Sequence, residues 1–216
     1  MRSEQTSIAL PRFYPIIDAE LLKKRGVELN DFARQLSDAG VRLVQYRAKH
    51  ASADEIAESA LALRSIFSHD DCLLILNDYA ELTAGSGWSG VHLGQKDASA
   101  DLARRSLGMG SIIGVSTHNE QQVTAEDAGC ANYIAVGPVF GTSTKADAEP
   151  VIGLEGVRRL RSLTRKPLVA IGGITRANCR AVIQAGADSV AVISELLAPS
   201  AHPLQKVAED FLLHLR

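Results

Sequence analysis

Polar residues that could bind an anion alternate at the end of one apolar run. Gln45, Arg47 and Lys49 stand two residues apart, so a β-strand that continued to Lys49 would place all three on one face. Arginine offers a fork of N–H donors that matches phosphate oxygens, and lysine offers a compact positive charge. The spacing therefore predicts an anion site, with a solvated strand end as the alternative for either cation taken alone.

Two carboxylates follow the next two apolar runs. Asp78 comes after Asn77, and Asp97 closes the segment Gly94–Asp97. The ends of adjacent strands can share a ligand, and Mg2+ typically takes one or two carboxylates and completes its shell with water and substrate phosphate. We therefore expect Asp78 and Asp97 to hold Mg2+. The alternative is that either carboxylate caps the helix after it.

Histidine and serine side chains end two further apolar runs. His92, inside Gly90–Gly94, is expected to face a pocket. In Gly114–His118 the glycine is expected to let the backbone turn tightly, and Ser116 offers a hydroxyl or its N–H to an anion. His118 either takes part in catalysis or begins the next helix as a solvated residue.

A hydroxyl-rich segment follows the sixth apolar run. Residues 137–145 are long for a connection in this chain and include Thr142, Thr144 and Lys145. Long loops in compact domains tend to be functional. These three side chains would hold phosphate groups and close over a substrate, and a simply polar loop is the alternative.

Backbone N–H groups offer a second phosphate site after the last two apolar runs. Gly172 and Gly173 follow the seventh run, and Ile193 and Ser194 end the eighth. Barrels of alternating strands and helices commonly bind phosphate at these two places. The phosphate interpretation is therefore favoured over simple turn chemistry at the glycine pair.

Two predicted anion sites, one with cations and Mg2+ and one built on backbone, suit two phosphorylated substrates. Nothing in the pattern pairs a nucleophile with an oriented base, so covalent catalysis is not favoured. Stabilisation of a departing pyrophosphate fits better, because a metal and fixed cations contribute most when charge develops on departing oxygens.

Eight short β-rich apolar runs carry these residues, and segments with helical spacing of apolar residues separate them. Strands that alternate with helices pair in parallel, and near-continuous apolar runs are typical of strands covered on both faces. We therefore predict an α/β fold, a single (β/α)8 TIM barrel, with an open doubly wound sheet as the alternative. The predicted strands are Phe13–Ile17, Val41–Tyr46, Leu73–Leu76, Gly90–Leu93, Ile112–Val115, Tyr133–Val136, Leu168–Ile171 and Ser189–Ile193.

The length of the chain indicates one barrel domain with short loops. Its 216 residues lie near the short end for this fold, whose usual size is about 250. Residues 1–10 are expected to form a flexible amino-terminal extension. Ser52 and Asp54 precede one helical pattern, Thr175 is expected to cap another, and Pro203–Leu215 is predicted to be the closing helix.

Composition excludes several classes of partner. A net charge of −2 with interspersed signs gives no basic field for nucleic acid, and no apolar run approaches the roughly 20 residues that span a bilayer. The first residues lack the apolar segment of a secretory signal, so a cytoplasmic protein is expected. The widely separated Cys72, Cys130 and Cys179 are expected to be reduced packing residues.

Seven motifs, in order, resemble those of thiamine-phosphate synthases. They are QYRAK, LNDY, GVHLGQKD, GVSTH, GPVFGTSTK, VAIGGIT and AVIS, and the match runs from about Tyr14 to about Ser194. The resemblance implies an enzyme that joins the diphosphate of 4-amino-5-hydroxymethyl-2-methylpyrimidine to the phosphate of a hydroxyethylthiazole, giving thiamine monophosphate and pyrophosphate. It implies a dissociative mechanism, in which pyrophosphate leaves first, the aminopyrimidine stabilises the methylene cation and the thiazole nitrogen captures it.

The resemblance also implies a role for each polar residue. Asp78 and Asp97 would hold Mg2+, and Gln45 and His92 would line the pyrimidine pocket. The residues that would bind the diphosphate are Arg47, Lys49, Asn77, Ser116 and Lys145. The residues that would take the thiazole phosphate are Thr142, Thr144, Gly173, Ile193 and Ser194. The expected catalytic residues are Arg47, Lys49, Ser116 and Lys145.

Two positions depart from the family pattern. Gly141 stands where many relatives carry proline, and Lys96 stands where an acidic residue is common. Two rival functions remain, a metal-free thiazole tautomerase on the same barrel and a non-catalytic phosphate or vitamin sensor. Retention of Asp78 and Asp97 counts against both. The expected partners are the two small phosphorylated substrates, with a homo-oligomer left open.

Overall fold

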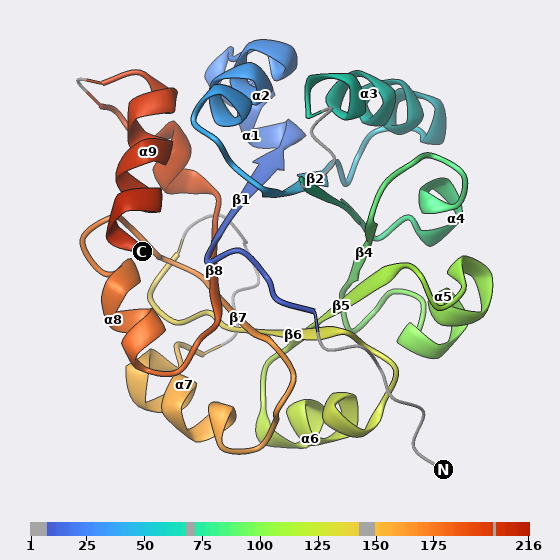
Figure 1. Ribbon diagram of the computed structural model, residues 1–216, viewed down its shortest axis with the longest axis vertical. Helices are drawn as coiled ribbons and strands as arrows, with labels where there is room; N and C mark the ends of the chain where they lie inside the picture. Colours follow the sequence, from blue (N-terminus) through green and yellow to red (C-terminus); the bar gives the residue numbers. More distant parts are fainter. Residues whose placement is uncertain (1–7, 68–71, 143–149, 201) are drawn as a thin grey trace.

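A closed barrel of eight parallel strands forms the centre of the computed structural model, which describes residues 8–67, 72–142, 150–200 and 202–216 (Figure 1). Strands that are neighbours in the sequence are neighbours in the barrel, and β1 pairs with β8 to close it. The predicted TIM barrel is therefore confirmed over the open sheet. The strands are β1 (Phe13–Asp18), β2 (Leu43–Arg47), β3 (Leu73–Asn77), β4 (Gly90–Leu93), β5 (Ile112–Thr117), β6 (Tyr133–Val136), β7 (Leu168–Ile171) and β8 (Ser189–Val192).

Helices form a ring around the barrel (Figure 1). Two helices follow β1, and the 3-10 helix η1 precedes the last helix after β8. Within the described residues, no helix is long and apolar enough to cross a membrane. The helices are α1 (Ala19–Arg25), α2 (Leu29–Asp38), α3 (Ala53–Ile66), α4 (Ala80–Thr83), α5 (Ala100–Leu107), α6 (Glu120–Ala128), α7 (Gly153–Arg161), α8 (Cys179–Gln184), η1 (Ser194–Leu197) and α9 (Leu204–His214).

The second strand is shorter than the alternation of polar residues predicts. β2 ends at Arg47, whose partner in β1 is Asp18, the residue at which that chain turns into α1. Lys49 lies in the exposed bend after the strand. The prediction that Gln45, Arg47 and Lys49 share one strand face is therefore wrong for Lys49.

One of the two predicted helix starts is correct. Ser52 caps α3 in a capping box, in which its Oγ accepts from the N–H of Glu55 at 3.3 Å. Thr175 does not cap α8, because a turn intervenes and the helix begins at Cys179 after Asn178. The N–H of Thr175 instead donates to the Oδ1 of Asn178 at 2.8 Å, so the prediction for Thr175 is wrong.

Apolar side chains fill both the barrel and the layer between barrel and helices. Phe13 of β1 stacks on Phe211 of α9, with ring centroids 4.8 Å apart, and Val207 and Phe211 of this closing helix are buried. Ile8 and Leu10 pack against the inner core. Because they precede β1, they lie at the amino-terminal end of the barrel, away from the strand ends that carry the predicted site.

The three cysteines are free thiols, as predicted for packing residues. Cys72 and Cys179 are buried, and Cys130 is half-buried. Burial raises the pKa of the Cys72 thiol to about 11, so this thiol stays protonated at neutral pH.

Candidate active site

Asp78 and Asp97 follow neighbouring strands at the carboxyl end of the barrel, and their carboxyl groups are close enough to interact. Asp78 follows β3 with a φ of 70°, a conformation that Asp and Asn adopt more readily than other side-chain-bearing residues. Its N–H donates to the carbonyl oxygen of His92 at 2.8 Å. Asp97 closes the turn after β4, where its Oδ2 accepts from the N–H of Gly94 at 2.7 Å. The fold thus brings together the two carboxylates that the sequence assigns to Mg2+.

The two carboxylates repel each other when both are charged. Burial and the neighbouring Asp97 raise the pKa of Asp78 to about 6, against the opposing effect of the charges on Lys49 and Arg47. A proton or a cation between the two groups relieves this repulsion. The pair is therefore suited to binding a cation.

The alternative role of these carboxylates as helix caps is not what the structure shows. The cap of α5 is Ser99, whose Oγ accepts from the N–H of Leu102 at 3.2 Å. Tyr79 precedes α4 and makes no side-chain cap bond. Asp78 and Asp97 remain available to a ligand.

The oxygen ligands of this pair fit Mg2+. The described residues contain no group of three or more histidine, cysteine, aspartate and glutamate side chains that could hold a metal ion. Mg2+ needs no such cage, because it keeps several waters and is commonly held by one or two carboxylates and substrate phosphates. A site formed by Asp78 and Asp97 would therefore be completed by a phosphorylated ligand.

Arg47 is held at the barrel mouth by acidic residues of the first strand and helix. Its Nη1 contacts the Oδ2 of Asp18 and lies 3.9 Å from the Oε2 of Glu20. The side chains of Asp18 and Arg47 are only 5% and 15% exposed. Asp18 also caps α1, because its Oδ1 accepts from the N–H of Leu21 at 2.9 Å. Arg47 is thus a cation of fixed position.

Glu20 connects this ion pair to the segment that carries Lys49. Its Oε1 accepts from the N–H of His50 at 3.0 Å. Burial alone would raise the pKa of Glu20, but several backbone hydrogen bonds, that from His50 foremost, and the charge of Arg47 outweigh burial and lower it. Glu20 therefore stays charged, pairs with Arg47 and anchors the backbone of the segment that carries Lys49.

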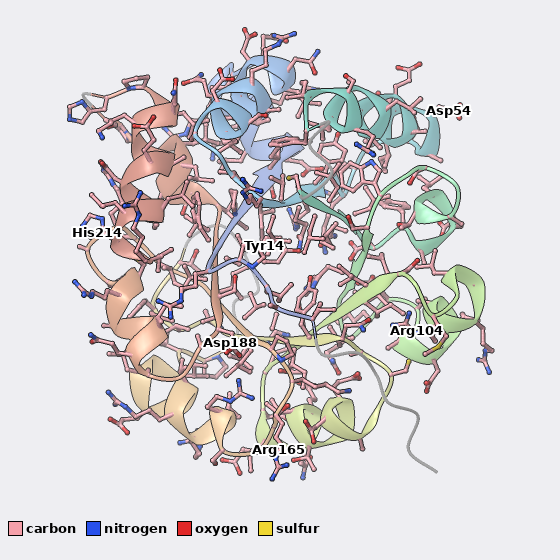
Figure 2. The ribbon with its side chains drawn as sticks, in the orientation of Figure 1. Tyr14, Asp54, Arg104, Arg165, Asp188 and His214 are labelled. Carbon is pink, nitrogen blue, oxygen red and sulfur yellow. The ribbon has the colours of Figure 1, made fainter. Side chains whose placement is uncertain are left out.

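A chain of hydrogen bonds crosses the inside of the barrel from β2 to β5. Gln45 Nε2 donates to Tyr14 Oη at 3.0 Å, and Tyr14 Oη lies 3.0 Å from Tyr133 Oη. Tyr133 Oη is 2.9 Å from Nδ1 of His92, and Nε2 of His92 is 2.8 Å from Oγ of Ser116. Tyr14 lies near the centre of the barrel in Figure 2. Gln45, His92 and Ser116, which the sequence assigns to substrate, thus form one connected unit.

Gly114 gives the Tyr133 ring its space. A Cβ at position 114 would lie 1.9 Å from Cζ of Tyr133. Gly114 lies inside β5 and pairs with Tyr133 of β6. The prediction that Gly114 turns the backbone is therefore wrong, and the glycine is required because an aromatic ring crosses its inner face.

His118 lies outside this chain. Its N–H donates to Oε1 of Gln122 at 2.7 Å, and its Nδ1 is 3.1 Å from the carbonyl oxygen of Gly137. It immediately precedes Asn119, the cap of α6. The structure favours the prediction that His118 begins the next helix over a catalytic role.

The loops after β6 and β7 pack against each other through the predicted glycine pair. Gly172 and Gly173 have φ of 103° and 61°. A Cβ at Gly172 would lie 2.5 Å from Cβ of Pro138, and one at Gly173 would lie 2.5 Å from the carbonyl oxygen of Gly141. Both positions therefore require glycine, for conformation and for close approach.

The remaining predicted site residues lie at the same end of the barrel or outside the described residues. Asn77 ends β3 and is buried. Ile193 and Ser194 follow β8, where Ser194 begins η1, and Thr142 follows β6 in the part of its loop that the structure describes. Thr144 and Lys145 lie outside the described residues. The binding roles of all these residues stay predictions.

Comparisons with known proteins identify the family. The family described as thiamine monophosphate synthase matches residues 13–196 of the chain. The chain belongs to this family. The thiamine-phosphate synthase of Koribacter versatilis (strain Ellin345) is 45% identical over 206 residues, which cover 94% of this chain and 96% of the relative. That of Chloroflexus aurantiacus is 41% identical over 187 residues, with 87% and 85% covered.

A solved structure supports the same conclusion. The thiamine phosphate pyrophosphorylase from Pyrococcus furiosus is 30% identical, with a TM-score of 0.83 over 94% of this chain and 95% of that one. The family predicted from the seven motifs is therefore confirmed, and the chain is an enzyme of the thiamine monophosphate synthase family.

Sequence reasoning missed three residues that organise the candidate active site of this family member. They are Tyr14 and Tyr133, inside the barrel, and Asp18, beside Arg47. Asp18 carries a signal in the sequence, since it is an acid directly after a predicted strand. The two tyrosines carry none, because each lies within an apolar run and only the strand register shows which face it occupies.

Proposed function

We propose that this enzyme condenses 4-amino-5-hydroxymethyl-2-methylpyrimidine diphosphate with hydroxyethylthiazole phosphate and releases thiamine monophosphate and pyrophosphate, in a reaction that depends on Mg2+. The observation that carries the proposal is that the carboxyl groups of Asp78 and Asp97 are close enough for one to raise the pKa of the other. Two charged carboxylates this close destabilise the folded protein unless a proton or a cation lies between them. A metal-free tautomerase or a sensor has no need of such a pair, whereas release of pyrophosphate does.

The charges around the carboxylate pair suit a diphosphate. Arg47 and Lys49 are near enough to oppose the rise in the pKa of Asp78, so cations and acidic groups surround one space. Mg2+ held by Asp78 and Asp97 would neutralise charge on the departing pyrophosphate. Arg47 and Lys49 would bind its remaining oxygens. The residues proposed to complete this site are Asn77, Ser116 and Lys145.

The pyrimidine and the thiazole phosphate would occupy the neighbouring parts of the barrel mouth. Gln45 and His92 would orient the pyrimidine ring, since both are buried polar side chains on the inner face. Thiazole phosphate would bind near the glycine pair after β7 and the start of η1. The residues proposed to hold it are Thr142, Thr144, Gly173, Ile193 and Ser194.

A dissociative reaction fits these residues. Pyrophosphate would leave first, the aminopyrimidine would stabilise the methylene cation, and the thiazole nitrogen would capture it. The chain would contribute fixed charges and orientation, because positioned donors stabilise charge as it develops on the departing oxygens. No nucleophile of the protein is required.

Release of pyrophosphate tests the proposal. The purified protein would be given each phosphorylated substrate alone and both together, with and without Mg2+. Asp78→Asn and Asp97→Asn would be measured beside Asp31→Asn, which removes an exposed carboxylate of α2. We expect release only with both substrates and Mg2+, a loss of activity in the first two variants and none in the third.

Two outcomes would contradict the proposal. Release that is independent of Mg2+ would remove the metal role of the carboxylate pair. The absence of release from a folded protein that binds thiazole phosphate alone would favour the tautomerase or the sensor.

A further inference from the structure

The hydrogen-bonded chain from Gln45 to Ser116 has a direction, because each tyrosine hydroxyl carries one hydrogen and donates once. Gln45 Nε2 donates to Tyr14 Oη, and the other partner of that hydroxyl among the described residues is Tyr133 Oη. Tyr14 therefore donates to Tyr133. In the opposite direction Tyr14 would receive two hydrogens, and its own would lack an acceptor among the described residues, which is costly for a buried hydroxyl.

The same reasoning fixes which atoms donate in the hydrogen bonds of His92. Tyr133 accepts from Tyr14 and so donates to Nδ1 of His92 at 2.9 Å. A neutral imidazole that accepts at Nδ1 carries its hydrogen on Nε2. Nε2 then donates to Oγ of Ser116 at 2.8 Å. No described residue accepts the hydrogen of the Ser116 hydroxyl, so this hydrogen is left for a ligand.

Burial keeps both tyrosine hydroxyls protonated, and packing fixes the Tyr133 ring. Burial raises the pKa of both Tyr14 and Tyr133, so both hydroxyls keep their hydrogens at neutral pH. The Tyr133 ring lies against Gly114 and stacks with the ring of His92 at a centroid distance of 5.6 Å. These contacts fix the Tyr133 ring, so its hydroxyl oxygen stays beside Nδ1 of His92.

We infer that Tyr133 is a positioning residue that holds His92 in the Nε2–H tautomer and thereby makes the Ser116 hydroxyl a hydrogen-bond donor toward the diphosphate. The inference rests on the proposed function, in which Ser116 binds that group. A donor at this position stabilises negative charge as it develops on departing oxygens, whereas a lone pair would repel that charge. Tyr133 acts through His92.

The tautomer of His92 can be measured by 15N NMR on the protein without metal or substrates. A His92→Gln variant assigns the signals among the six histidines. In the parent protein we expect the signals of a neutral imidazole with its hydrogen on Nε2. Tyr133→Phe keeps the ring and removes the donor, so we expect a mixture with the Nδ1–H tautomer.

Tyr14→Phe is the matched comparison, because it removes an equally buried hydroxyl one step further along the chain. Tyr133 can still donate to His92 in that variant. We therefore expect the tautomer of the parent protein. A tautomer that changes equally in Tyr14→Phe and Tyr133→Phe would show a general effect of packing and would overturn the inference.

Kinetics test the effect on Ser116. We expect Tyr133→Phe to lower kcat roughly ten-fold, the effect of one lost hydrogen bond to a charged group, with a smaller change in KM for the pyrimidine diphosphate. Ser116→Ala should lower kcat at least as much, and the double variant should lose little more than Ser116→Ala alone. Tyr46→Phe removes a buried hydroxyl on the outer face of the barrel and should keep the kcat of the parent protein.

Different outcomes test the role of Tyr133 and the proposed function. An Nδ1–H tautomer in the parent protein, or losses of kcat that multiply in the double variant, would overturn the role of Tyr133. Because the tautomer is measured without substrates, the absence of pyrophosphate release would overturn the proposed function while leaving the hydrogen-bond direction to be judged by NMR.

Discussion

The guanidinium of Arg176 and the carboxylate of Glu195 form an ion pair, with Nε and Oε1 3.3 Å apart, that joins the turn after β7 to η1 after β8. Arg176 also lies 3.5 Å from a carboxylate oxygen of Asp210 in α9. Gly173 and Ser194 lie three residues and one residue before the two partners. The pair therefore fixes the spacing of the two segments proposed to hold the thiazole phosphate.

We predict that Arg176→Gln raises KM for the thiazole phosphate several-fold and leaves KM for the pyrimidine diphosphate unchanged. The side chains of Arg176 and Glu195 are 32% and 19% exposed, so the loss in free energy of unfolding should stay near 1 kcal/mol. Steady-state kinetics with each substrate varied in turn measure the effect. Arg34→Gln, at an exposed pair of α2, is the control. Equal changes in both KM values would contradict this role.

Mg2+ should stabilise the protein through Asp78 and Asp97. Ligand binding to the folded state alone adds about 2.7 kcal/mol at a concentration of 100 times Kd, so thermal unfolding in increasing Mg2+ should show a rising Tm. Asp78→Asn keeps a residue that tolerates the φ of 70°. It should raise Tm without Mg2+, because it removes the repulsion, and should abolish the further rise. A variant that keeps the Mg2+ response would show that the ion binds elsewhere.

Gly114→Ala should destabilise the protein through Tyr133. The added Cβ would lie 1.9 Å from Cζ and 2.3 Å from Oη, so the ring must move, at a cost of about 3 kcal/mol for overpacking. Tyr133→Leu removes both atoms, and the double variant should lose less than the sum of the two single losses. Gly110→Ala, which adds a methyl group in open space, should change little. Denaturant unfolding measures all four variants, and strict additivity would show that the two positions are independent.

The barrel could be predicted from the sequence because each strand is buried on both faces and each turn is polar. Runs such as Leu168–Ile171 therefore appear as unbroken apolar segments between helical ones. The carboxyl ends of the strands were predicted for the same reason, since Asp78 and Ser116 are polar residues at the ends of apolar runs. The prediction failed for Lys49. The alternation of polar residues continues to Lys49, but β2 ends at Arg47 because its neighbour β1 turns into α1 at that level.

The hydrogen bonds inside the barrel could not be predicted, because they depend on the register of strands far apart in the sequence. Tyr14 and Tyr133 are 119 residues apart and meet only when the barrel closes. Within Phe13–Asp18 nothing distinguishes the inner face from the outer, since all six residues are buried. The role of Gly114 depends on the same register, so the sequence alone indicated a turn.

The contact between Asp18 and Arg47 leads to the last prediction. Asp18→Asn keeps an oxygen that can accept from the N–H of Leu21, so the cap of α1 is retained and only the charge is lost. Arg47 is 15% exposed and would keep only the more distant Glu20, 3.9 Å away, as an acidic partner among its described ion pairs. We expect the free energy of unfolding to fall by about 2 kcal/mol, less than for a fully buried pair broken on one side.

The same variant should raise KM for the pyrimidine diphosphate, because Arg47 loses the partner that holds it in position for the phosphate oxygens. Asp31→Asn breaks a pair whose side chains are 59% and 70% exposed and should cost under about 0.5 kcal/mol with no change in KM. Denaturant unfolding and kinetics on both variants measure the difference. If Asp18→Asn instead lowered KM, Asp18 would compete with the diphosphate for Arg47 and would not position it.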